Sequence, residues 1–154
     1  MAMRIGLISD THGLLRPDAL AFLQGSDLIV HAGDIGGPDI LQALSAIAPL
    51  TVVRGNNDRG PWAASIRETE WLQAAGINLY AIHDLAQLDV DPAAAGIQVV
   101  VSGHSHQPRV DRREGVLYVN PGSPGPRRFR LPISIGELLV GDSGRIDART
   151  VELG

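Results

Sequence analysis

The chain has 154 residues, the length of one domain, and its formal net charge of −4 argues against nucleic-acid binding through a broad basic face. Hydrophobic residues make up 44% and charged residues 19%, which excludes a disordered or fibrous chain. Cysteine is absent, and this excludes a disulfide framework, a zinc–thiolate site and a cysteine nucleophile.

Neither a signal-peptide pattern nor an apolar run of the ~18–20 residues that span a bilayer is present in the sequence. We therefore expect one cytoplasmic domain over residues 1–154, without a membrane partner.

Short apolar runs alternate with helical stretches over the first two thirds of the chain, which is typical of α/β architecture. In chain order, the pattern predicts strands over 3–9, 27–31 and 51–54, and helices over 17–24 and 38–47. The first helix starts with Pro17, which the first turn of a helix tolerates because its amide needs no partner there. Residues 68–72 and 77–82 flank Ala75-Gly76 and predict a hairpin, with a helix as the alternative for the first piece.

The last third of the chain is rich in β segments. A buried strand is predicted over residues 97–101, followed by short β segments around 110 and over 116–119, 133–139 and 145–151. Residues 121–126, Pro-Gly-Ser-Pro-Gly-Pro, are expected to form a structured loop and not a domain boundary.

Five of the predicted strands are followed directly by a side chain that carries an oxygen or an imidazole. In open α/β sheets, functional groups gather outside the carboxyl ends of the strands. If these ends share one edge, seven side chains converge there: Asp10, His12, Asp34, Asn56, His83, His104 and His106. Each residue alone could be a helix cap, a turn residue or a core histidine, but that does not explain why the same types follow every strand. The fifth histidine, His31, is expected to face the core.

The spacing within these blocks favours metal coordination. Residues two apart in extended backbone point to the same side, so Asp10 can act with His12, and His104 with His106. Carboxylate, amide and imidazole donors suit Mn, Fe, Co, Ni or Zn, among which Mn is our first choice. Seven candidates exceed what one tetrahedral ion can use, so we expect two divalent metal ions. Two ions suit phosphoryl transfer because they can clamp the attacking and the leaving oxygen.

The ordered set Asp-x-His, Gly-Asp, Gly-Asn-x-Asp, His and Gly-His-x-His resembles the calcineurin-like metallophosphoesterases. The small size, the Asp-Thr-His-Gly start at Asp10 and the Asn-Pro-Gly-Ser segment at 120–123 look like the compact bacterial and archaeal phosphodiesterase branch. The resemblance covers residues 4 to about 140. It implies a four-layer α/β/β/α sandwich of two mixed sheets flanked by helices.

The resemblance also implies the roles of individual residues. Asp10, His12 and His106 would hold the first metal, Asp34 would bridge, and Asn56, His83 and His104 would hold the second. A hydroxide that bridges the metals would attack the phosphorus. Asp58 is expected to accept a hydrogen bond from a histidine ligand. The residues expected to act in catalysis are Asp34, Asn56, Asn57 and Asp58.

Two positions depart from the family pattern. Many relatives have a histidine after the ligand asparagine, where it is thought to protonate the leaving group or bind phosphate, and here Asn57 stands there. Many also have His-Gly-His at the fourth block, where this chain has His83-Asp84-Leu85. Both metals should still bind, but the first departure favours substrates with good leaving groups.

Arg127 and Arg128 are candidates, with Asn57, for binding the substrate phosphate; a solvated edge or a subunit contact is the alternative for the arginines. The expected function is hydrolysis of a small phosphate-ester or nucleotide-like substrate, with a diester favoured over a monoester. The rival is a non-enzymatic scaffold like the retromer scaffold subunit, which resembles this fold but lacks a complete ligand set. The sequence is compatible with a homo-oligomer.

Overall fold

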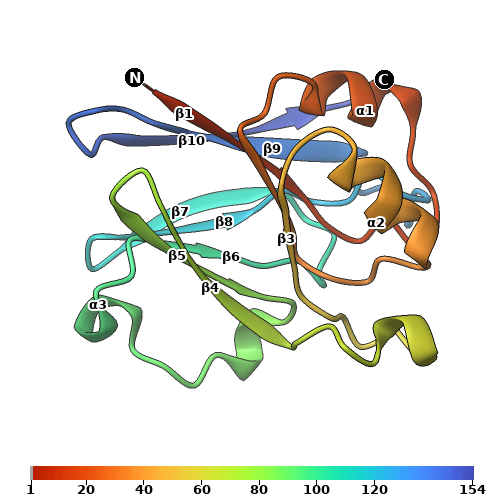
Figure 1. Ribbon diagram of the computed structural model, residues 1–154, viewed down its shortest axis with the longest axis horizontal. Helices are drawn as coiled ribbons and strands as arrows, with labels where there is room; N and C mark the ends of the chain where they lie inside the picture. Colours follow the sequence, from red (N-terminus) through yellow and green to blue (C-terminus); the bar gives the residue numbers. More distant parts are fainter. Residues whose placement is uncertain (1) are drawn as a thin grey trace.

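Two five-stranded sheets pack face to face at the centre of the molecule (Figure 1). The computed structural model describes residues 2–154. One sheet has the strand order β10-β9-β1-β2-β3, and the other has the order β4-β5-β6-β8-β7. The strands are β1 (Met3–Ile8), β2 (Leu28–His31), β3 (Leu50–Val52), β4 (Thr69–Ala74), β5 (Ile77–Ile82), β6 (Val99–Val101), β7 (Arg109–Arg113), β8 (Val116–Asn120), β9 (Ser134–Val140) and β10 (Ile146–Glu152).

Each sheet has a parallel centre. Strands β1, β2 and β3 are parallel in one sheet, and β5, β6 and β8 are parallel in the other. The remaining strands, β9, β10, β4 and β7, pair antiparallel with their neighbours. Parallel neighbours end at the same edge of a sheet, so this topology brings together the polar residues at the strand ends.

The alternation of side chains along β1 builds two layers of core. Ile5 and Leu7 point between the sheets, where they pack in a cluster that includes Leu79 and Val99 of the opposite sheet. Ile8 belongs to the cluster on the outer face, under the helices. This period of two is what a strand buried on both faces requires.

Helices α1 (Pro17–Leu23) and α2 (Pro38–Ser45) cover the outer face of the first sheet (Figure 1). In α2, Ile40 and Leu44 are buried one turn apart. The outer face of the other sheet is covered by residues 84–97, which contain η2 (Leu85–Gln87) and the short α3 (Pro92–Ala95). The expected four-layer sandwich is confirmed, with a thin fourth layer.

The predicted hairpin is also confirmed. Strands β4 and β5 pair antiparallel through Ala75 and Gly76, whose φ angles of 52° and 79° are those of a tight hairpin turn. The strand predicted over 51–54 is shorter than expected, because the amide of Arg54 donates to Arg67 O at the start of the next segment. The prediction missed α3, η2 and η1 (Pro61–Ala63), each of which is only one turn long. Within residues 2–154, no helix is long and apolar enough to cross a membrane.

Candidate metal centre

The loops after five of the strands meet at one edge of the sandwich. The loop after β1 pairs with the loop after β2, since the amides of Asp10 and His12 donate to Gly33 O and Asp34 O at 2.9 and 3.0 Å. The other sheet joins them through His83, whose Nδ1 lies 2.7 Å from Ala32 O. The convergence expected from the sequence is therefore realised across both sheets.

Five of the seven predicted ligands form one continuous cluster. Asp10, His12 and His106 offer ligand atoms that all lie within 4.8 Å of one another, and so do Asp10, Asp34 and His83. The Nε2 atoms of His12 and His106 are 3.2 Å apart. Oδ2 of Asp34 lies 3.7 Å from His12 Nε2 and 3.3 Å from His83 Nε2. Both carboxylates thus contact histidines of both halves of the cluster.

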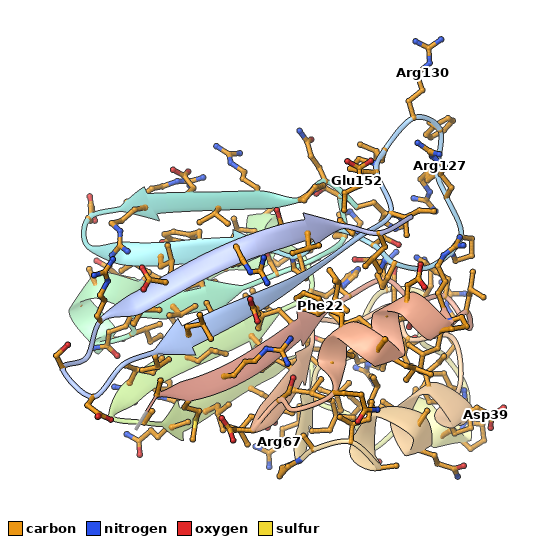
Figure 2. The ribbon with its side chains drawn as sticks, turned by 90° about the horizontal axis from the view of Figure 1, so that it is seen from above. Phe22, Asp39, Arg67, Arg127, Arg130 and Glu152 are labelled. Carbon is orange, nitrogen blue, oxygen red and sulfur yellow. The ribbon has the colours of Figure 1, made fainter. Side chains whose placement is uncertain are left out.

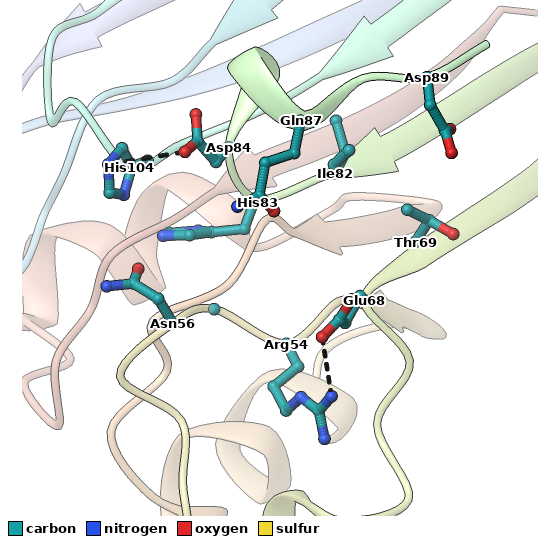
Figure 3. A pocket seen from close by; sticks show the side chains of 11 residues that line it. Arg54, Asn56, Glu68, Thr69, Ile82, His83, Asp84, Gln87, Asp89 and His104 are labelled. Atoms are coloured by element: carbon teal, nitrogen blue, oxygen red, sulfur yellow. Dashed lines mark hydrogen bonds and ion pairs between the residues drawn. The ribbon is translucent and has the colours of Figure 1, made fainter.

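The other two predicted ligands lie at the exposed rim. The ring of His104 stands 5.3 Å from the ring of His83, centroid to centroid, and its Nε2 lies 3.9 Å from Asp84 Oδ2. Figure 3 shows Asn56 across from His104, with His83 between them. His104 and Asn56 are both exposed, and His104 is outside the cluster of acidic and imidazole groups.

Unpartnered polar atoms indicate that this cluster fits a cation. Within residues 2–154, three buried side-chain polar atoms lack a hydrogen-bond partner: Asp10 Oδ1, His83 Nε2 and His106 Nδ1. All three belong to candidate ligands, and two of them, Asp10 Oδ1 and His83 Nε2, face the cluster. A buried donor or acceptor without a partner costs about 1–3 kcal/mol, and a bound ion would remove that cost.

The neighbouring groups leave the required lone pairs free. His83 Nδ1–H donates to Ala32 O, so in the neutral ring, which is the form that binds a metal, Nε2 carries the lone pair. Asp10 Oδ2 accepts from Ser9 Oγ at 2.7 Å and from the amide of His104 at 3.0 Å, which leaves Oδ1 available. The ligand atoms are therefore oriented before any ion binds.

Charges are strongly coupled in the cluster. Burial raises the pKa of the Asp34 carboxyl, but the His83 ring beside it, with Nε2 3.3 Å from Oδ2, and the hydrogen bond from the Asn57 amide outweigh burial and hold the pKa below its usual range. Burial lowers the pKa of His83, but the Asp34 and Asp10 carboxylates, at 3.3 and 3.9 Å from Nε2, outweigh burial and raise that pKa. For His12, burial prevails and the pKa is lowered. Asp34 is thus ionised, as a metal ligand must be.

The backbone is strained where the ligands lie. Eight non-glycine residues within 2–154 have a positive φ angle, and five of them are predicted ligands, namely Asp10, His12, Asp34, His104 and His106. Left-handed backbone costs a residue with a Cβ about 1–2 kcal/mol and persists only where the surrounding structure enforces it. Such strain gathers at functional sites, which supports the assignment of these loops as the site.

Two glycines let the loops approach closely. A Cβ on Gly55 would lie 2.1 Å from Asp34 Oδ1, and one on Gly103 would lie 2.0 Å from Ser9 Oγ and 2.5 Å from Asp10 Oδ2. Any larger residue would displace the carboxylates that the cluster needs.

Asp58 does not have the role that the sequence indicated. It was expected to accept from a histidine ligand, but its Oδ1 accepts from the amides of Ile35 and Gly36 at 2.8 and 3.2 Å, and its Oδ2 from the amide of Gly55 at 2.9 Å. The first two bonds join the loop that carries Asp34 to the loop that carries Asn56, and the third closes the Asn56 loop on itself. Both oxygens of the Asp58 carboxylate accept from backbone amides, and no hydrogen bond from a histidine to Asp58 is present among residues 2–154. Asp58 therefore positions the Asp34 loop and does not orient a histidine ligand.

Asn57 holds the Asp34 carboxylate from outside. Its backbone amide donates to Asp34 Oδ1 at 2.9 Å, and its side-chain amide donates to Oδ2 at 3.1 Å. Asn57 is exposed. The role predicted for Asn57 with substrate stays a prediction.

The predicted arginines lie on the loop after β8. The stem of this loop is fixed to the site, since Ser123 Oγ donates to Asp10 O at 2.7 Å and Arg16 donates to Pro124 O at 3.0 Å. Figure 2 shows Arg130 extending from the loop into solvent. Arg127 and Arg128 are exposed, and the charge of Arg128 is among those that lower the pKa of His12. Substrate binding by these two arginines stays a prediction.

The sequence reasoning assigned no role to Ser9 or Asn120. Asn120 ends β8, and its side-chain amide donates to Gly103 O at 3.0 Å and to Ser105 Oγ at 3.1 Å, which holds the loop that carries His104 and His106. A signal was available for Asn120, because it comes after an apolar strand in the same way as the ligands do.

His31 is fully buried, as expected. Its Nδ1 accepts from the amide of Gly33 at 3.0 Å, and its Nε2 lies 2.9 Å from Thr11 Oγ1. Burial lowers its pKa to about 4, so the ring is neutral near pH 7.

The sequence is similar to known phosphoesterases. A model of the calcineurin-like phosphoesterase superfamily domain matches residues 3–142. A curated protein of Methanothermobacter thermautotrophicus, named "Probable metallophosphoesterase", is 37% identical, and the match covers 99% of this chain and 94% of that protein.

Two solved structures share the fold. A protein described as a novel archaeal phosphodiesterase superimposes with a TM-score of 0.78 at 21% identity, over 97% of this chain and 100% of that one. Vacuolar protein sorting 29 from Cryptosporidium parvum superimposes with a TM-score of 0.79 at 17% identity, over 99% of this chain and 98% of that one. At these identities the likeness concerns the fold and not the activity.

Proposed function

Because this chain belongs to the calcineurin-like phosphoesterase superfamily, we propose that it hydrolyses a phosphodiester with two divalent metal ions. The observation that carries the proposal is the cluster of ionised and unpartnered donor atoms at the strand ends. A structural role would not require buried lone pairs to be left without partners. Mn²⁺ is our first choice, and a cytoplasmic location is part of the same proposal.

In this proposal, Asp10, His12 and His106 hold one ion, and His83, His104 and Asn56 hold the other. Asp34 is shared, which is supported by the position of its Oδ2 between His12 and His83. When bound, the ions supply positive charge that activates water and offsets charge on the phosphoryl oxygens.

The surrounding residues prepare the ligand atoms for this task. Asn57 and Asp58 fix Asp34 and its loop through four hydrogen bonds, two to the Asp34 carboxylate and two from the backbone amides of Ile35 and Gly36. Ser9 and the His104 amide orient Asp10. Ligands held in this way need little reorganisation during the reaction, which is the main source of electrostatic catalysis.

This site lacks a histidine at the position from which the leaving group would be protonated. Asn57 stands after Asn56 where a histidine acid would be needed, and its amide donates to Asp34. We therefore propose that diesters with an acidic leaving group are the better substrates. Arg127 and Arg128 are proposed to attract the phosphate, an effect that salt would screen.

The rival proposal is that the chain is a scaffold without enzymatic activity, and this proposal is compatible with the same fold. The similar structures include both a phosphodiesterase and a vacuolar sorting protein, so the fold does not discriminate. The metal-binding ability of the residues at the strand ends distinguishes an enzyme from a scaffold, and here all seven can donate a lone pair to a metal.

The test is a metal titration followed by an assay. Chelated protein is loaded with Mn²⁺, and we expect about two ions per chain and hydrolysis of bis-p-nitrophenyl phosphate faster than of p-nitrophenyl phosphate. Chelated protein without added metal is the matched control. One ion per chain at saturation would remove the binuclear proposal. Inactivity toward both esters with Mn²⁺, Fe²⁺, Co²⁺, Ni²⁺ and Zn²⁺ would favour the scaffold.

A further inference from the structure

A cavity of about 480 Å³ lies directly beside the cluster of candidate metal ligands and shares His83 with it. One end is formed by Asn56, His83 and His104, and Thr69 and Asp89 line the cavity at a distance from that end (Figure 3). His83 is 5% exposed and joins the two sites, since it lines this cavity while its Nε2 lies 3.3 Å from Asp34 Oδ2 in the ligand cluster. The cavity therefore extends from the candidate ligands to a region lined by Thr69 and Asp89, and its volume suits a small molecule.

The charges that line the cavity are unbalanced. The Arg54 guanidinium lies 3.0 Å from Glu68 Oε1, so these two charges neutralise each other. The Asp84 carboxylate faces His104, with Oδ2 3.9 Å from Nε2. Asp89 has neither an ion-pair nor a hydrogen-bond partner among residues 2–154. The carboxylate of Asp89, an exposed residue, is therefore left without a countercharge at the end of the cavity remote from the candidate ligands.

The wall of the cavity is polar and lacks Phe, Tyr and Trp. The Thr69 hydroxyl and the Gln87 amide offer hydrogen bonds, and Ile82 is the apolar part of the wall. A nucleobase would have no aromatic ring to stack on, which is how proteins commonly hold an unpaired base. A smaller cavity of about 260 Å³ does contain an aromatic side chain, Tyr118, but the Arg113 guanidinium lies 5.0 Å from that ring.

We infer that this cavity binds the second ester substituent of the phosphodiester, and that Asp89 selects a small positively charged group such as an alkylammonium. This inference rests on the proposed function. The phosphate would lie at the His83 end, and the cationic group would lie near Asp89. An anionic substituent would be disfavoured by the same charge, and a nucleobase by the lack of a stacking partner.

The test uses three p-nitrophenyl diesters that release the same leaving group. Their second substituents are 2-(trimethylammonio)ethyl, its neutral isostere 3,3-dimethylbutyl, and a carboxyalkyl chain of similar length. We expect kcat/KM to favour the cationic ester over the neutral one about three- to fivefold, mainly through KM, as for one partly solvated charge pair. The anionic ester should be the poorest substrate.

Asp89→Asn should bring the ratio of cationic to neutral ester close to one. The matched control is Asp111→Asn, which removes an acid of the smaller cavity and should leave the ratio unchanged. As a readout apart from turnover, calorimetry on Mn²⁺-loaded protein should show weaker binding of 2-(trimethylammonio)ethyl phosphate to Asp89→Asn than to the parent.

The outcomes separate the inference from the proposal beneath it. Equal kcat/KM for the three esters, or a ratio that survives Asp89→Asn, would overturn the role of Asp89 and leave a phosphodiesterase. Failure of the loaded protein to cleave any of the three esters would overturn the proposed function, and the inference with it.

Discussion

Protonation of His31 should weaken the attachment of the Asp34 loop to the core. The neutral ring accepts from the Gly33 amide through Nδ1 and donates through Nε2 to Thr11 Oγ1. The Thr11 hydroxyl in turn donates to Ile35 O at 2.8 Å. A protonated ring cannot accept from Gly33, so acid should break the bond nearest to Asp34.

The size of the effect can be worked out from the pKa. Burial lowers the pKa of His31 from 6.5 to about 4, so the unfolded chain takes up the proton first as the pH falls. The contribution of His31 to stability is full above 6.5 and is lost as the pH falls toward 4. Proton linkage gives a loss of about 2 kcal/mol at about pH 5, and about 3 kcal/mol below the folded pKa.

The assay is urea unfolding of chelated protein at about pH 7.5 and about pH 5, with His31→Asn as the matched variant. His83 has a raised pKa and therefore adds stability as the pH falls, but it does so in both proteins. The parent should lose about 2 kcal/mol more than the variant between the two pH values. An equal pH dependence in the two proteins would refute the reasoning, because it would mean that His31 is protonated as easily in the folded chain as in the unfolded one.

Three further predictions concern the carboxylate loops. Asp34→Ala should reduce kcat/KM by roughly tenfold more than Asn56→Ala, because a shared ligand serves both ions; steady-state kinetics with saturating Mn²⁺ measure this, and equal losses would contradict the shared role. Asn57→His should raise the rate for alkyl diesters relative to aryl diesters, because a positioned acid is worth ~100–10,000-fold; a parent rate that is independent of leaving-group pKa would remove the role given to Asn57. Asp58→Ala should cost about 3 kcal/mol in urea unfolding, since three amides lose their acceptor; Asp58→Asn keeps one acceptor oxygen and should cost less, and a cost within ~0.5 kcal/mol for both variants would show that these bonds contribute little.

The strand ends could be predicted because their signal is local. Asp10, Asp34 and His83 each come directly after an apolar run, and parallel strands bring the residues at their carboxyl ends to one edge of the sheet. The β4–β5 hairpin was predictable for the same reason, since Ala75-Gly76 is turn chemistry between two β segments.

The partners of individual side chains were decided by the tertiary structure. Asp58 accepts from the Ile35 and Gly36 amides, which lie more than twenty positions away, and nothing in the composition around it marks that contact. The charge balance of the cavity beside His83 likewise depends on the pairing of Arg54 with Glu68 across two segments. The sequence by itself determined the kind of atoms at the site, because residue type and strand period are local properties. The fold decided which atoms are left unpaired, because hydrogen bonds and ion pairs depend on distances between residues far apart in the chain.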